Sequence, residues 1–291
     1  MYSEGKRGGA AGPSVTGKRK PAGKRAGGSR QPKNGSVAVQ RERVGTPAVR
    51  SDGKIRLNKF IASSGLYSRR EADRLMEMGE VTVNDEIAQP GALVTGKEKI
   101  KVRDQIIRAQ DRKVVVAWYK PAGVTVTRSD PHAKVTLEDV FHYPIHLTYA
   151  GRLDRDSEGL LLMTNDGGLI DAMMRSANDH EKEYIVRTRG KISDEDLHQM
   201  SKGIWLKDLE VKTKPCRIER LGDYTFRIVL TQGLNRQIRR MCKARGHEVK
   251  SLKRVRVLNI TVKGLMPGMQ RELTQDETMK LYEMAGVTMP E

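Results

Sequence analysis

Apolar and polar residues first follow a regular pattern near residue 55. Between residues 57 and 61 the apolar positions recur at helical spacing, which predicts a short helix that Gly65 ends. The string Ser68-Arg69-Arg70-Glu71 has the form of a capping box and predicts the start of a second helix. Residues 81–87 alternate apolar and polar side chains around a polar turn, which predicts two short strands. We therefore expect residues 54–102 to form a small α/β module.

The second predicted helix has an apolar side and an arginine side. The arginines that lie away from its apolar residues are Arg69, Arg70 and Arg74. A row of this kind can bind RNA phosphates. An ordinary solvated helix face explains the same three residues equally well when they are considered alone.

From residue 113 to residue 291 strand-like and helix-like patterns alternate. Residues 114–118 are apolar and predict a buried strand. Residues 193–203 and 274–286 carry start and stop signals of helices. Mixed strands and helices predict an α+β fold. The charged, weakly patterned residues 103–112 predict a linker between this part and the module.

Residues 1–53 contain almost no large apolar side chains. Such a composition cannot offset the entropy of ordering, so we expect a disordered basic arm. Residues 1–52 hold 12 Lys and Arg against 3 Asp and Glu, a charge of +9 within a total of +18. The remaining residues carry the other +9, so the folded part should also have a basic face. The expected partner is a polyanion, and nucleic acid fits best.

Composition and spacing exclude several other classes. No run approaches the roughly 18 apolar residues of a membrane helix, and the N-terminus lacks the apolar core of a signal peptide. The two cysteines, Cys216 and Cys242, form no zinc cluster and favour a reducing cytoplasm. His142 and His146 are four residues apart, but Pro144 breaks the helix that a metal site of that spacing needs. We expect a cytoplasmic protein with no metal and no membrane partner.

One ten-residue string combines opposite charges with a turn: Gly151-Arg152-Leu153-Asp154-Arg155-Asp156-Ser157-Glu158-Gly159-Leu160. Residues two apart in an extended backbone share a face, so Arg152 and Asp154 would point the same way with Leu153 packed behind them. A neighbouring guanidinium holds such a carboxylate in place. A surface ion pair before a buried strand is the alternative for an isolated Arg-x-Asp sequence. Asp156 is a weaker candidate for the acid, and we expect it to have a structural role.

A second candidate string is Lys182-Glu183-Tyr184. Tyr184 starts a predicted strand, where a half-buried sheet tyrosine is the alternative interpretation.

Residues 232–242 predict a helix capped by Asn235, with a buried stripe and a basic face. The stripe consists of Ile238, Met241 and Cys242, and the basic face of Arg236, Arg240 and Lys243. Arg239 lies at their border, about 60° from Cys242 on a helical wheel. A guanidinium at that border could reach a buried carboxylate while its neighbours contact phosphates. An ordinary basic solvent face is the alternative.

Together these strings resemble the motifs of ribosomal RNA pseudouridine synthases of the RsuA/RluB/RluE/RluF family. The motifs occur in the family's order at residues 120–123, 151–160, 182–184 and 235–240, within a match that runs over 114–274. Residues 178–184 and 233–242 are most similar to the RluF-like members. Trp118-Tyr119 departs from the family's usual Leu-Asn, so we expect a local change of packing there.

Residues 55–102 resemble the small RNA-binding domain first described in ribosomal protein S4. The matching strings lie at 56–61, 68–72 and 81–84. Asp85 replaces a usual Gly and Gly96-Lys97-Glu98 replaces a usual Pro-Gly-Asp, so we expect altered turns within the same fold. The two resemblances imply an S4-type α/β module followed, at 113–291, by a catalytic domain with a mixed, mainly antiparallel sheet.

The synthase resemblance implies isomerisation of a uridine to pseudouridine within RNA, without a cofactor. It assigns the essential carboxylate to Asp154, the ring that stacks on the uracil to Tyr184, and the partner of Asp154 to Arg239. The target base must leave its stack, and Arg152 is a candidate to fill the gap. The remaining expected RNA contacts are Lys120, Asn235, Arg236, Arg240 and the three arginines of the module.

The RluF-like strings imply that the substrate is large-subunit (23S) ribosomal RNA, with tRNA as a second candidate, and nothing demands more than a monomer. One alternative is a sibling synthase that acts on another ribosomal site. Another is a non-catalytic RNA-binding factor for ribosome assembly, which would not need a carboxylate, a tyrosine and an arginine in three separate motifs. A nucleotide-dependent enzyme is poorly supported, because neither Gly-x-x-x-x-Gly-Lys-Ser/Thr nor Gly-x-Gly-x-x-Gly occurs.

Overall fold

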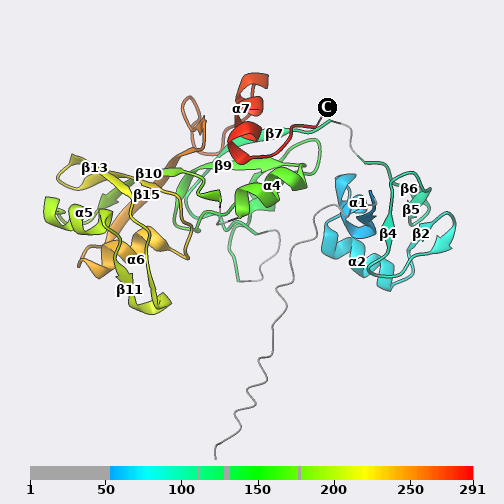
Figure 1. Cartoon of the computed structure of the whole chain (residues 1–291), viewed down its shortest axis with the longest axis horizontal. Coiled ribbons are helices and arrows are strands. Elements are labelled where there is room, and N and C mark those ends of the chain that lie inside the picture. The colour runs from blue at the N-terminus through cyan, green and yellow to red at the C-terminus, as the bar shows by residue number, and fades with distance from the viewer. Residues whose placement is uncertain (1–52, 110–111, 128–131, 176–177, 291) are drawn as a thin grey trace, which may run out of the picture. The chain divides into compact units, whose positions relative to one another are not determined.

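The computed structural model describes residues 53–109, 112–127, 132–175 and 178–290 (Figure 1). The basic arm expected at residues 1–53 lies outside these ranges except for its last residue. Within the described residues, no helix is long and apolar enough to cross a membrane.

Two helices and a four-stranded antiparallel sheet form the N-terminal module. The helices are α1 (Leu57–Ser63) and α2 (Arg69–Glu77), and they share one apolar core with the sheet. The sheet has the order β3–β2–β5–β6, with β2 (Val81–Val83), β3 (Glu86–Ile87), β5 (Ile100–Val102) and β6 (Gln105–Ile106). A separate pair joins β1 (Ile55–Arg56) to β4 (Leu93–Val94). The predicted capping box is confirmed: the Ser68 hydroxyl accepts from Glu71 N, and the Glu71 carboxylate accepts from Ser68 N.

The module extends beyond the boundary expected at residue 102. Arg103 and Asp104 make a two-residue turn with φ of 48° and 64°, which leads into β6. Ile107 is 3% exposed and belongs to the module's core. The expected linker is therefore shorter than 103–112. The pattern missed β6 because the strand has only two residues and its Ile106 points to solvent.

One continuous sheet organises the larger domain, in the order β13–β14–β10–β15–β9–β7–β17. Its strands are β7 (Val115–Lys120), β9 (Glu158–Thr164), β10 (Lys182–Thr188), β13 (Arg217–Gly222), β14 (Thr225–Leu230), β15 (Val249–Val257) and β17 (Gln270–Glu272), with β8 (Thr148–Tyr149) on β9 and β16 (Ile260–Thr261) on β15. All of these pairings are antiparallel except that of β9 with β15. The expected mixed, mainly antiparallel sheet is confirmed.

The parallel contact between β9 and β15 joins the two halves of this sheet. It pairs Glu158 with Lys253 and Gly159 with Arg254. Gly159 has a φ of 107°, and a Cβ built on it would meet the backbone of Arg254, with its nitrogen only 2.8 Å away. A glycine is required here because any side chain would push the two strands apart.

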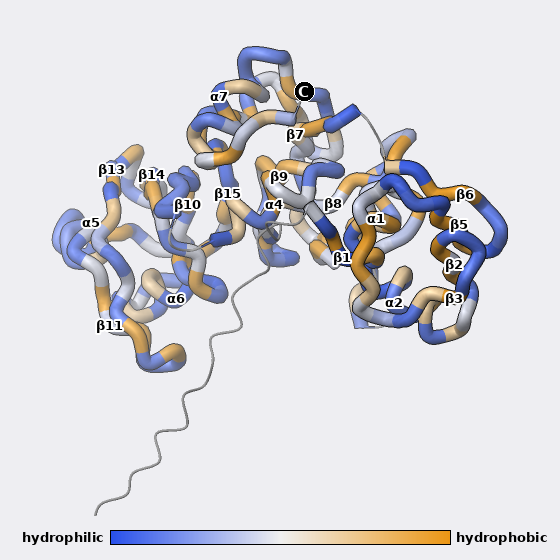
Figure 2. Tube along the Cα trace, turned by 45° about the vertical axis from the view of Figure 1, so that its right-hand side comes forward, coloured by the Kyte–Doolittle hydropathy of each residue, from blue (hydrophilic) through white to orange (hydrophobic). Residues whose placement is uncertain are grey.

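Helices cover the two halves of the sheet separately (Figure 1). On one half, α4 (Gly167–Met174) and α7 (Gln275–Ala285) share a core with β7 and β9. On the other half, α5 (Asp194–Ser201) and α6 (Gln237–Ala244) pack on β10, β14 and β15. The remaining elements are α3 (Leu137–Val140), a 3₁₀ turn at Lys207–Leu209, and the pair of β11 (Trp205–Leu206) with β12 (Val211–Lys212). In Figure 2, α1 carries both hydrophobic and hydrophilic colours, as expected for a helix that buries one side.

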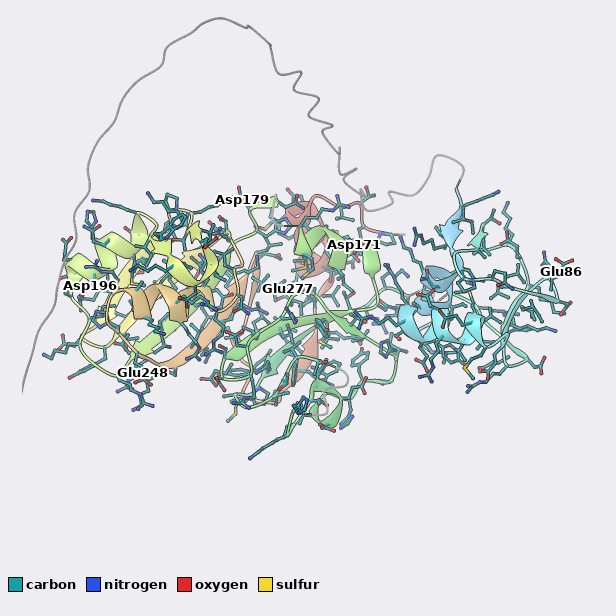
Figure 3. All side chains as sticks on the ribbon, turned by 90° about the horizontal axis from the view of Figure 1, so that it is seen from below. Glu86, Asp171, Asp179, Asp196, Glu248 and Glu277 are labelled. Carbon is teal, nitrogen blue, oxygen red and sulfur yellow. The ribbon has the colours of Figure 1, made fainter. Side chains whose placement is uncertain are left out.

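Asp196, at the start of α5, binds two residues that follow α6; Figure 3 labels it beside α5. Its carboxylate accepts from Arg245 Nε at 2.8 Å and lies 3.0 Å from His247 Nε2. These contacts join the start of α5 to the segment that follows α6. Hydrogen bonds from Ser193 and His247, and the charge of Arg245, hold the pKa of Asp196 well below its usual range.

Candidate active site

A cavity of about 500 Å³ lies at the junction of the two halves of the large domain. Its walls come from the loop between β8 and β9, the end of α4, the start of β10, β15 and the segment that leads into α6. Asp154, Tyr184, Asn235 and Arg236 line it, as does Arg152. The structure therefore brings together residues from three of the four strings singled out above.

Asp154 lies on the segment 152–157, which we call the Asp154 loop. An extended backbone was expected at residues 152–154; a turn follows, in which Ser157 N donates to Asp154 O at 3.0 Å, and β9 begins at Glu158. The expected alternation nevertheless holds locally. Leu153 is buried, Arg152 is exposed, and the Asp154 side chain is 30% exposed toward the cavity.

Lys120 supports this loop from behind, so the expectation that it contacts RNA is wrong. Its side chain is fully buried, and its ammonium group donates to Ser157 O at 2.7 Å, Pro121 O at 2.8 Å and Arg155 O at 3.3 Å. Burial lowers the pKa of Lys120 to about 8, while attraction by Asp154 and Asp156 opposes that shift. All three N–H donors of the ammonium group are bound to backbone carbonyls, so none is free to bind a phosphate.

The guanidinium nearest to Asp154 belongs to Arg236, although Arg239 was expected there. Arg236 Nη1 lies 3.9 Å from Asp154 Oδ2 and 3.7 Å from Asp156 Oδ2. Arg239 instead donates to two backbone carbonyls, Asp156 O at 2.9 Å and Val249 O at 3.4 Å. Burial and the charge of Arg236 lower the pKa of Arg239, and the two aspartates act in the opposite direction. Arg239 thus acts on the Asp154 loop rather than on its carboxylate.

The start of α6 also differs from the prediction that Asn235 caps it. The N-cap is Arg236, which makes no side-chain capping bond and has left-handed backbone angles, φ 49° and ψ 34°. Asn235 accepts from Arg240 through its carbonyl (3.0 Å) and its side-chain oxygen (3.3 Å), and Arg240 also pairs with Asp208. The predicted buried stripe of this helix is confirmed, because Ile238, Met241 and Cys242 are at most 4% exposed.

Tyr184 lies on β10 opposite Ile228 of β14 and Arg254 of β15. Its half-buried ring packs on the cores of both halves of the domain and lines the cavity. An aromatic face held in this way can stack on a planar base.

The three arginines of the module lie outside this cavity. Arg69, Arg70 and Arg74 are exposed on α2, and no ion pair within 4.0 Å involves them in the described part of the chain. Their role in RNA binding stays a prediction.

Other residues that line the cavity were not predicted as ligands, and His180, Lys182 and Arg254 are among them. Arg254 is 2% exposed; its Nε donates to Leu160 O at 2.7 Å and its Nη1 to Arg152 O at 3.4 Å. The sequence did contain a signal for Arg254. It lies two positions after the apolar Leu252 in a strand, so both side chains should point to the buried face. No group of three His, Cys, Asp or Glu suited to a metal occurs among the residues that the structure describes.

Comparisons with known proteins agree with this architecture. Residues 114–244 match the RNA pseudouridylate synthase family, and residues 55–100 match the S4 domain. The chain is 41% identical over 239 residues to the dual-specificity RNA pseudouridine synthase RluF of Escherichia coli (strain K12), covering 80% of each protein. It is 35% identical over 238 residues to the ribosomal large subunit pseudouridine synthase B of Bacillus subtilis (strain 168), covering 79% of this chain and 96% of that protein. A crystal structure of a pseudouridylate synthase matches 78% of this chain and 99% of its own, with 29% identity and a TM-score of 0.58.

Proposed function

The chain belongs to the RNA pseudouridine synthase family and carries an S4 domain, and from this premise we propose that it isomerises a specific uridine of large-subunit ribosomal RNA. We propose a tRNA as its second substrate. One observation carries the assignment to the cavity described above: Asp154, Tyr184 and Arg236, from three separate segments, line one space of about 500 Å³. That volume is in the range of ordinary small-molecule sites and suits a single nucleoside.

The proposed reaction breaks the bond between uracil N1 and ribose C1′ and forms a bond from C5 to the same carbon. The C5 proton leaves and N1 gains a proton, so the overall change is an isomerisation. Asp154 is the group placed to act on the nucleotide, since it is the one carboxylate among the described residues that line the cavity. Tyr184 would hold the uracil by stacking. Arg236 would attract the Asp154 carboxylate, and Arg239 would position the loop through Asp156 O.

The RNA substrate follows from the family and from charge. The names of the two relatives state a dual-specificity RNA enzyme and a ribosomal large-subunit enzyme. The total charge of +18 favours a polyanion whose backbone can contact many cations. A uridine in folded RNA would have to be flipped into the cavity, with Arg152 at its edge placed to occupy the gap. We propose that the enzyme acts as a monomer in the cytoplasm, where this substrate would be met.

The test is pseudouridine mapping of ribosomal RNA and tRNA from cells that lack this gene, complemented with wild type, Asp154→Asn or Asp223→Asn. Asp223 is the matched control, because its carboxylate pairs with Lys191 and does not line the cavity. We expect one or a few sites to disappear in the deletion strain and to return with wild type and Asp223→Asn only. A map that is unchanged by the deletion would refute the proposal and favour the RNA-binding assembly factor. Sites confined to small-subunit RNA would indicate a sibling synthase.

A further inference from the structure

Cations outnumber carboxylates around the cavity. Six lining residues are Lys or Arg: Arg152, Arg155, Arg175, Lys182, Arg236 and Arg254. Arg236 faces Asp154 and Asp156, and Arg155 pairs with Asp156 at 3.2 Å. Lys182 and Arg254 have no carboxylate within 4.0 Å among the described residues. This side of the cavity therefore holds two cations that no protein anion compensates.

The two cations share one face of the sheet with Tyr184. Lys182 and Tyr184 are two residues apart on β10, so their side chains point to the same side. Arg254 is the cross-strand partner of Tyr184 on β15, beside a shift of register between Glu183 and Tyr184, and both residues line the cavity. Along a strand, two residues span roughly 7 Å. A base stacked on Tyr184 would thus bring its own ribose and phosphate to the level of Lys182.

The surroundings of both cations are energetically unfavourable. Arg254 Nη2 is buried and has no hydrogen-bond partner, and Nδ1 of the neighbouring His180 is in the same state. Burial and the charge of Arg254 lower the pKa of Lys182, which donates to His180 O at 3.0 Å. Unpaired buried donors and like charges side by side are unfavourable, and an anion between them would relieve both effects.

We infer that Lys182 and Arg254 form a phosphate subsite that binds a phosphodiester next to the target uridine. This inference rests on the proposed function and specifies how the flipped nucleotide is held. A phosphodiester is the anion that every RNA substrate carries on each side of the reacting ribose. Arg254 would bind the phosphate through Nη2, because its Nε and Nη1 already donate to backbone carbonyls, and Lys182 would act as a point charge.

The test uses the full chain and an RNA stem-loop that spans the mapped uridine. Lys182→Gln should weaken binding about tenfold, as expected for the loss of one hydrogen bond to a charged group. It should also reduce the dependence of log K on log salt by about 0.7, the share of one phosphate contact in single-stranded RNA. Lys182→Arg should restore most of both. Lys280→Gln is the matched control, because Lys280 is exposed on α7 and pairs with Glu283.

A neutral methylphosphonate, placed in turn at the two linkages that flank the uridine, identifies the phosphate. At one of these linkages the methylphosphonate should weaken binding by wild type about as much as Lys182→Gln weakens binding of the unmodified RNA. The same methylphosphonate should not weaken binding by Lys182→Gln any further. The subsite would be overturned if Lys182→Gln had the same salt dependence of binding as wild type and lost the same affinity on methylphosphonate substitution. Arg254→Lys serves as a second variant, since it keeps a cation where Arg254→Ala would also remove the bond to Leu160 O. If wild type forms no pseudouridine in the unmodified stem-loop, the proposed function itself fails, and that outcome is read separately.

Discussion

Replacing Gly159 with alanine tests whether the contact between β9 and β15 holds the large domain together. Gly159 pairs with Arg254 in the parallel junction of the sheet. Its φ of 107° lies outside the region that L-residues adopt with ease, and a Cβ would lie 2.8 Å from Arg254 N and closer still to Arg254 O. These neighbours are backbone atoms, so they cannot move away as a flexible side chain could.

Two costs add at this position. Holding alanine at a sparsely populated φ costs about 1–3 kcal/mol. Forcing two strand backbones apart costs about another 1–3 kcal/mol, as overpacking does in a core. We therefore expect Gly159→Ala to lower the free energy of unfolding of this domain by about 2–6 kcal/mol, a large effect for one methyl group. Activity should fall as well, because Asp154 lies on the segment that leads into β9.

The assay is urea unfolding followed by tryptophan fluorescence. Both tryptophans, Trp118 and Trp205, belong to the large domain, so their signal reports this domain and not the module. Gly264→Ala separates the two costs, since Gly264 has a φ of 79° but nothing within 4 Å of its added Cβ. Gly190→Ala is the baseline, with neither a positive φ nor a close neighbour. A Gly159→Ala loss no larger than that of Gly264→Ala would refute the clash.

Three further predictions concern the residues around the Asp154 loop. The pKa of Lys120 is about 8 in the folded chain against 10.5 for an ordinary lysine, so the unfolded chain holds more protons above pH 8. The free energy of unfolding should therefore rise by about 2 kcal/mol from about pH 7 to about pH 9.5 in wild type, and urea unfolding should show no such rise in Lys120→Met. Arg236→Gly should keep or raise stability by up to about 1 kcal/mol, because it removes left-handed strain, and yet lower pseudouridine formation at least tenfold in single-turnover assays. Arg239→Lys loses a fork that spans two carbonyls, so kcat should fall about 10- to 100-fold with little change in KM; an effect confined to KM would contradict a positioning role.

Local signals in the sequence were sufficient for elements whose stabilising contacts are local. The capping box at Ser68 and the stripe of α6 depend on residues three or four apart, and both appear as expected. β6 was not predicted, because a strand of two residues is too short to show an alternation of apolar and polar side chains. The start of α6 was misplaced for another reason. Arg236 adopts left-handed angles at the N-cap, a conformation that the pattern of side chains does not encode.

Long-range contacts explain why residues were identified more reliably than their roles. A lysine before a proline looks available to a phosphate, but Lys120 enters the core and meets carbonyls about thirty-five positions later in the chain. Arg239 was placed correctly at the border of the basic face, although its partner is a carbonyl two residues beyond the expected carboxylate. Arg254 was missed because its burial depends on the parallel junction, which no local pattern reveals.

The Asp154 loop is held by three cations that lie in three different segments of the chain: Lys120 on β7, Arg239 on α6 and Arg254 on β15. Arg254 donates to Arg152 O, Lys120 to Arg155 O and Ser157 O, and Arg239 to Asp156 O. These four carbonyls accept charge-assisted hydrogen bonds, of which the bond from Lys120 to Ser157 O is buried, so the backbone of the loop is fixed. The side chain between them, Asp154, is left half-exposed in the cavity. A carboxylate at the end of a short side chain can be aimed only if its backbone is fixed, and a charge-assisted hydrogen bond fixes a carbonyl about twice as strongly as a neutral one. This requirement explains why three cations from separate parts of the chain bind the backbone of the loop, although none of them lies within 4.0 Å of the Asp154 carboxylate.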